Sequence, residues 1–206
     1  MRFGLTHRFV MIAMAGLLAL TPACSWQKIP PEPEYTTMTP IPMVVGVELD
    51  DSAYSLAYGT QAITEIREMK VFQYIIWPYN SGTPVDAVLK LSIDGVWKTT
   101  GGVRSAIFVG LTLGLLGPFL GPKTTGDHNV TAILERDAKA IVNYSFRAET
   151  VVSHGLSANE DVVMFKAEAL QTRKITVGLA TRFNDDRDKI SGARVTDDAE
   201  AGQGDE

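Results

Sequence analysis

Only a few side chains in this sequence are of the types that carry out catalysis. Of the three histidines, His7 lies in an apolar N-terminal segment, which leaves His128 and His154. A histidine held by a carboxylate can act as a general base, so convergence of His154 with Asp94 and Glu149 in a pocket would indicate a hydrolytic site. A glycine follows His154, and we interpret this histidine as a surface turn residue. We therefore expect no catalytic residue.

Motifs that bind metals, cofactors or nucleotides are also missing from the sequence. It contains neither His-Glu-x-x-His nor Gly-x-Ser-x-Gly, and a single cysteine excludes a multi-cysteine metal site and an internal disulfide. Residues 117–124 look superficially like a phosphate-binding loop, but Pro122 precedes Lys123 where that loop needs a glycine with a free amide. The net charge of −5 argues against a protein that binds nucleic acid by neutralising its phosphates. We expect no metal, no cofactor and no nucleic-acid partner.

Cys24, the only cysteine, directly follows a segment organised like a secretory signal. Basic residues among the first eight positions precede an uninterrupted apolar run over residues 9–20. In a helix this run would extend about 18 Å, which is shorter than the hydrocarbon core of about 30 Å. We therefore predict a cleavable signal peptide over residues 1–23 rather than a permanent span.

The residues around Cys24 resemble the lipobox of bacterial lipoproteins. Leu20-Thr21-Pro22-Ala23-Cys24 has a small residue before the cysteine, although Thr21 stands where the usual pattern has an aliphatic residue and Pro22 is atypical. The resemblance implies a diacylglyceryl group on the Cys24 thiol and a third acyl chain, such as palmitate, on its amine. Each buried CH₂ contributes about 0.8 kcal/mol, so these chains form a stable anchor. Ser25 in place of aspartate resembles the sorting pattern for the outer membrane of Gram-negative bacteria.

Composition divides the mature chain into three regions. The full sequence of 206 residues, of which 45% are apolar and 21% charged, has an ordinary globular composition and the length of one domain. Five prolines in residues 24–42 indicate an extended spacer that lifts the folded part off the bilayer. Residues 43–183 form the predicted domain. Residues 184–206 contain eight acidic and three basic residues, which predicts a solvated, disordered tail.

Hydrophobic periodicity predicts that the domain is α+β. Strands are expected where apolar residues alternate or form short runs, and helices where they recur every three or four positions. The expected elements are a strand over 43–49, a helix over 58–70, strands over 71–77 and 85–97, a hairpin formed by 128–135 and 138–153, and a final helix. We predict a mainly antiparallel sheet covered by the two helices.

The final helix is expected to supply the second covering element of this sheet. Ser157 followed by Glu160 forms the capping-box pattern that begins a helix. Its predicted apolar positions are Val162, Val163, Phe165, Ala169, Leu170, Val177 and Ala180.

Residues 105–122 form an uncharged apolar segment between two of the predicted strands. As one helix it would extend about 27 Å, with its glycines along one side as in packed membrane helices. Pro118 argues against a continuous helix, so a bent hairpin fits better than a straight span. Three interpretations remain: a core element or covered loop, a segment that enters or touches the membrane, and an oligomer contact. The residues expected to make a membrane or partner contact are Phe108, Leu111, Leu115 and Phe119.

The lipobox-like start, the Pro-rich spacer and the strand opened by residues 84–89 together resemble small α+β lipoproteins of the bacterial envelope whose roles are unassigned. The resemblance implies a non-enzymatic accessory or assembly module that is anchored in the outer membrane and faces the periplasm, with cell-surface exposure as an alternative. Besides the membrane, the expected partners are an envelope protein and a second copy of this chain. The alternative function is an envelope hydrolase or a peptidoglycan-associated factor.

Overall fold

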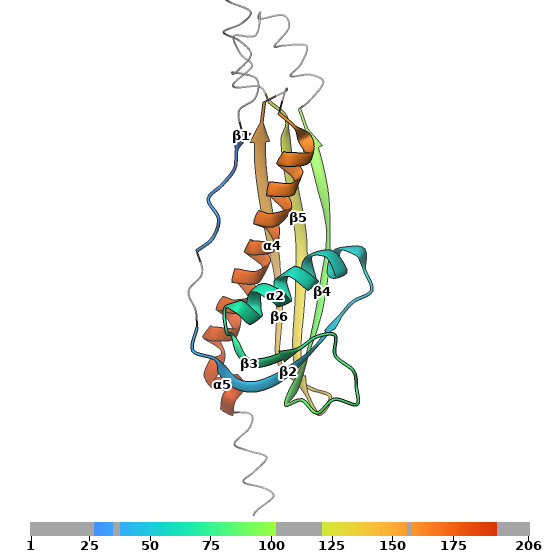
Figure 1. Cartoon of the computed structure of the whole chain (residues 1–206), viewed down its shortest axis with the longest axis vertical. Helices are drawn as coiled ribbons and strands as arrows, with labels where there is room; N and C mark the ends of the chain where they lie inside the picture. Colours follow the sequence, from blue (N-terminus) through green and yellow to red (C-terminus); the bar gives the residue numbers. More distant parts are fainter. Residues whose placement is uncertain (1–26, 35–37, 102–120, 156–157, 193–206) are drawn as a thin grey trace, which may run out of the picture. The chain divides into compact units, whose positions relative to one another are not determined.

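The computed structural model describes residues 27–34, 38–101, 121–155 and 158–192 of the chain. They form an α+β fold, which confirms the fold class predicted from the sequence (Figure 1). In chain order the elements are β1 (Gln27–Lys28), β2 (Ile41–Leu49), the π-helical turn η2 (Ser55–Gly59), α2 (Thr60–Glu68), β3 (Phe72–Ile76), β4 (Ala87–Thr100), β5 (Lys123–Arg136), β6 (Lys139–His154), α4 (Glu160–Asp185) and α5 (Arg187–Gly192).

The described residues belong to two compact units, and β4, β5, β6 and α4 each contribute to both. The first unit contains β1, the last residues of β4 and β6, the first residues of β5 and the first turns of α4. The second contains the remaining parts of these elements together with β2, η2, α2, β3 and α5. The divisions fall after Pro31, Val96, Gly126, Glu149 and Glu168.

The strands form one mixed sheet in the order β1-β6-β5-β4-β2-β3. β2 runs parallel to both of its neighbours, with Val45 opposite Ala87 on β4 and opposite Ile75 on β3. A mainly antiparallel sheet was predicted, and these two pairings depart from that prediction. The reason is that η2 and α2 carry the chain back to the end of the sheet where β2 began, so β3 must run in the same direction as β2.

β5 and β6 form the predicted hairpin with its turn shifted by one residue. Asp137 and Ala138 are the two turn residues, with φ of 50° and 60°, instead of Arg136 and Asp137. Two successive residues with positive φ match a type I′ turn, whose twist suits the right-handed twist of paired strands. The turn therefore fixes the register along the hairpin.

The hydrophobic core of the second unit lies on one face of the sheet, under α2 and the C-terminal part of α4 (Figure 1). On β4, Ala87, Leu89, Leu91 and Ile93 are buried, whereas Lys90 and Asp94 on the alternate face are exposed. This alternation was predicted, and it follows from the two-residue period of a strand. The helices contribute Ala62, Ile63, Ile66, Ile175, Leu179, Ala180 and Phe183 to the same core.

The cap of α4 is a different residue from the one the sequence indicated. The side-chain Oδ1 of Asn159 accepts hydrogen bonds from the backbone N–H groups of Asp161 at 3.0 Å and Val162 at 3.3 Å. Asparagine is among the best N-cap residues because its side chain satisfies amides that lack a partner within the helix. Ser157, the predicted cap, lies outside the described residues.

The folded part also extends beyond Phe183, where the predicted tail began. α4 continues to Asp185 and α5 runs to Gly192, with the side chain of Ile190 fully buried in the core. The Tyr144 hydroxyl donates a hydrogen bond to Asp186 Oδ2 at 2.8 Å, and Arg187 donates to the carbonyl oxygens of Thr39 and Pro40. The buried side chain of Ile190 and these polar contacts hold residues 184–192 in the fold, although their acidic composition predicted a disordered tail.

We predict that Ile190→Ala lowers the free energy of unfolding by about 2–4 kcal/mol, because it removes a buried side chain and leaves a cavity. Truncation after Gly192 should change that free energy by less than about 0.5 kcal/mol, since it removes a polar, acidic stretch. Urea denaturation of the mature chain measures both. An equal loss in the truncated protein would contradict the prediction.

Candidate functional site

The five residues that the sequence singled out as sites lie outside the described residues. Cys24 precedes β1, and Phe108, Leu111, Leu115 and Phe119 fall between β4 and β5. The described residues next to them on the chain are Gln27, Gly101 and Gly121. These flanking positions determine where the two segments join the first unit.

β1 attaches the start of the described chain to the end of β6. Gln27 pairs with His154 and Lys28 with Ser153 in antiparallel register. The Lys166 ammonium on α4 donates a hydrogen bond to Gln27 Oε1 at 3.3 Å. Because a pairing of only two residues gives no periodic signal, Gln27 and Lys28 were predicted to belong to the spacer. Gln27 is thus held by both the sheet and the helix of the first unit.

The ends of β4 and β5 meet at the same place. The hydroxyl oxygens of Thr99 and Thr124 lie 3.1 Å apart across these strands. The His154 backbone N–H donates to the Pro122 carbonyl oxygen at 3.1 Å. His154 therefore contacts both Gln27 and the residue that leads into β5. We call this part of the first unit, formed by β1, residues 97–101, residues 121–126 and the end of β6, the β1 end.

A small apolar cluster supports the β1 end from within the first unit. Its buried members are Val152, Val163 and Ala167, with Ile29, Trp97 and Ala158 packed against them. The Trp97 ring lies over Gly126, where an added Cβ would come within 2.5 Å of the ring. Glycine is required here because any side chain would displace the indole.

Two apolar side chains of α4 in the same unit remain exposed. Phe165 is 73% exposed and Val162 is 42% exposed, although both were predicted to face the sheet. The buried positions are Val163, Ala167 and Leu170, spaced by four and three residues. Phe165 is two residues from Val163, about 200° around the helix, so it points away from the sheet. The 100° step per residue already shows that Val163 and Phe165 cannot both face the sheet.

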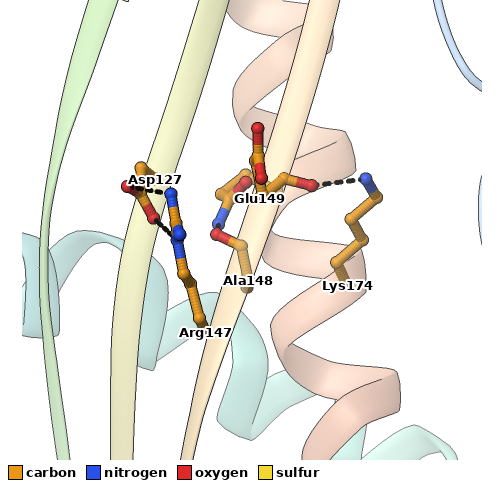
Figure 2. A network of polar contacts seen from close by, with 6 residues as sticks. Asp127, Arg147, Ala148, Glu149 and Lys174 are labelled. Atoms are coloured by element: carbon orange, nitrogen blue, oxygen red, sulfur yellow. Dashed lines mark hydrogen bonds and ion pairs between the residues drawn. The ribbon is translucent and has the colours of Figure 1, made fainter.

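Opposite the core, the sheet of the second unit presents a polar face. Figure 2 shows Arg147 on β6 forming a two-pronged ion pair with Asp127 on β5, at 2.5 and 2.6 Å. Lys174 belongs to α4, which covers the core face, and its ammonium donates to the backbone oxygen of Glu149 at 2.6 Å, as the same figure shows. On β4, Lys90 forms an ion pair with Glu135 at 2.7 Å. Exposed pairs of this kind contribute little to stability, so they define a solvated surface.

Residues of the second unit within the described part of the chain line two surface hollows. One of about 240 Å³ lies on the polar face and is lined by Glu48, Leu49, Asp50, Lys90, Leu91, Ser92, Thr131 and Ile133. Within it the Ser92 hydroxyl donates to Asp50 Oδ2 at 3.0 Å. The other, of about 290 Å³, follows the edge strand β3 and is lined by Pro40, Arg67, Lys70, Phe72, Gln73, Tyr74 and Ile75. Neither lining includes a histidine or a cysteine that could act as a base or nucleophile.

The three groups considered for hydrolysis belong to two different units, His154 to the first and Asp94 and Glu149 to the second. His154 is buried at the end of β6, with Nδ1 3.2 Å from the Gly155 oxygen, so its interpretation as a surface turn residue was wrong. Glu149 is five residues earlier on the same strand and lies on the opposite, exposed face. Asp94 is also exposed, on the polar face of β4.

His128, the other histidine of the described chain, is a core residue. Its ring packs edge-on against Tyr54 and Tyr58, with centroid distances of 5.3 and 4.9 Å. Gly95 allows this packing, because an added Cβ would lie 2.4 Å from the His128 ring. Burial lowers the pKa of His128 below its ordinary value of 6.5, while the neighbouring Asp127 and Asp94 act in the opposite direction. The net effect favours a neutral imidazole.

Within the described ranges there is no group of three or more histidine, cysteine, aspartate or glutamate side chains arranged to hold a metal ion. Among the helices described, none combines the length and apolarity needed to cross a bilayer.

No known protein family and no curated protein matches this chain. Several solved structures resemble it weakly. A Xanthomonas campestris protein of the DUF330 family is 10% identical and aligns over 84% of this chain and 97% of its own, with a TM-score of 0.41. A candidate lipoprotein of Caulobacter crescentus is 12% identical over 68% and 90%, with a TM-score of 0.36. The PelC dodecamer of Paraburkholderia phytofirmans is 15% identical over 74% and 95%, with a TM-score of 0.30. These values are too low to carry an argument.

We predict that acidification weakens the fold through His128. Because its pKa is lowered in the folded state, the unfolded chain binds the proton more tightly, and stability should fall as the pH drops below about 6.5. Urea denaturation between pH 7.5 and 5.5 should show a smaller loss in His128→Gln than in the unchanged protein. Parallel curves for the two proteins would contradict this assignment.

Proposed function

We propose that the protein is a non-enzymatic lipoprotein of the bacterial cell envelope, anchored through Cys24 in the outer membrane and facing the periplasm. In this proposal the α+β domain works as an accessory or assembly module that binds other envelope components. The proposal depends mainly on one observation: the only cysteine lies between a predicted export signal and the first described strand, where lipid attachment would occur.

The position of β1 supports an anchor close to the domain. Gln27, three residues after Cys24, is paired with His154 and bonded to Lys166. Three residues extend at most about 11 Å, so the proposed lipid would hold the first unit near the membrane surface. The prolines expected to form a free spacer follow this attachment, and Pro33 accepts a hydrogen bond from Arg173 at 3.4 Å.

The arrangement of titratable groups favours binding over catalysis. In the second unit His128 is buried, and the carboxylates Asp94 and Glu149 are solvated on the other face of the sheet; in the first unit His154 is buried. General acid–base catalysis needs such groups within hydrogen-bond reach of one substrate atom. The alternative of an envelope hydrolase or peptidoglycan-associated enzyme would therefore require groups other than these.

We predict that Cys24→Ala abolishes acylation and leaves the protein unprocessed or soluble in the periplasm, because no other thiol can carry the lipid. Metabolic labelling with a palmitate analogue and separation of membranes from soluble fractions measure both effects. Ser25→Ala is the matched control and should remain acylated. Normal processing and membrane retention of Cys24→Ala would contradict the lipoprotein proposal.

We also predict that Ser25→Asp keeps the acyl chains but moves the protein to the inner membrane. The expectation depends on the resemblance of Ser25 to the outer-membrane sorting pattern. Density-gradient separation of the two membranes measures the distribution, with Ser25→Ala again as the control. An unchanged outer-membrane position for Ser25→Asp would show that residue 25 does not determine sorting of this protein.

A further inference from the structure

We propose that Val162 and Phe165 on α4, which we call the α4 ridge, form a second contact with the bilayer that holds Cys24. The ridge and the lipid anchor would then fix how the first unit lies on the membrane surface. This inference rests on the proposed function, because it takes that bilayer as the ridge's partner.

The exposure of the ridge is the first observation that carries the inference. Phe165 is 73% exposed, the highest value among the large apolar side chains of the described residues, and Val162 is three residues earlier on the same side of the helix. Apolar side chains on one face of a helix, beside basic residues, are typical of helices that lie in the membrane interface. The opposite side of α4 is already occupied, since Val163 and Ala167 pack in the cluster under the β1 end.

The second observation is the short connection between the ridge and Cys24. Lys166, the next residue after Phe165, donates a hydrogen bond to Gln27, and only two residues separate Gln27 from Cys24. Consecutive Cα atoms are about 3.8 Å apart, so the backbone at Phe165 lies close to the residue that binds Gln27. An anchored Cys24 would therefore keep the ridge within a short distance of the lipid headgroups.

Charge is the third observation. The described residues of the first unit carry four lysines, Lys28, Lys98, Lys123 and Lys166, against three carboxylates, Glu160, Asp161 and Glu168. The chain as a whole has a net charge of −5. The excess of lysines suits a surface of anionic phospholipids, since lysine stems lie along apolar surface while the ammonium groups reach the headgroups. Asp161 and Glu168, four residues before and three residues after Phe165, share its side of the helix and act against this attraction. Glu160 and Asp161 lie in the first turn of α4, where the helix dipole favours them.

The test uses the full lipidated protein in vesicles of phosphatidylethanolamine and phosphatidylglycerol. Phe165 is replaced by the photoreactive residue p-benzoylphenylalanine, which is similar in shape and forms covalent adducts with whatever it touches. Tyr74 on β3 is the matched control position, because it is also an aromatic residue and is 63% exposed, but belongs to the second unit. Mass spectrometry after illumination identifies the adducts and also reports the acyl chains on Cys24.

We expect phospholipid adducts at position 165 in several-fold excess over position 74. Equal lipid labelling at the two positions would overturn the inference, and so would adducts at 165 that consist of a second copy of this chain or of another protein. The mass of the unlabelled protein separates the two proposals. Absence of acyl chains would contradict the lipoprotein proposal, whereas an acylated protein without lipid adducts at 165 would contradict only the α4 ridge.

Discussion

The pairing of Gln27 and Lys28 with the end of β6 is the contact on which the arrangement of the first unit depends. It fixes the start of the described chain three residues after Cys24, and His154 links the same point to Pro122 at the start of β5. Two residues of strand pairing contribute little stability alone. Here the bond from Lys166 and the packing of Ile29 on the apolar cluster support them. The predicted lipid site and the apolar segment between β4 and β5 consequently join the fold at one place.

The sheet of the second unit separates structural from surface roles by the alternation of its strands. One face carries the core, where the ring of His128 packs edge-on against Tyr54 and Tyr58. The other face carries ion pairs, such as Asp127 with Arg147, that stay in contact with water. The alternation of the strands therefore assigns packing to one face of this sheet and solvation to the other.

α4 serves both units through different parts of its length. Its last turns pack Leu179, Ala180 and Phe183 in the main core, and Gln171 donates a hydrogen bond to the Ala148 oxygen at 2.9 Å. In its first turns only Val163 and Ala167 are buried, in a much smaller cluster. Because so few side chains are buried there, Val162 and Phe165 are left in solvent. The apolar surface of the first unit is thus a consequence of its small core.

The sequence by itself determined the α+β class, the alternation of buried and exposed residues along β4, and the hairpin, because these follow from local periodicity and turn chemistry. It also located Cys24 after an export signal, which remains a prediction about residues outside the described structure. Tertiary structure decided the parallel direction of β2 relative to β3 and β4, the pairing of β1, and the burial of His154 and Ile190. Each of these depends on contacts between residues far apart in the chain, such as Gln27 with His154, for which a local pattern gives no signal. The exposure of Phe165 was also decided this way, since the sheet selects which side of α4 is buried.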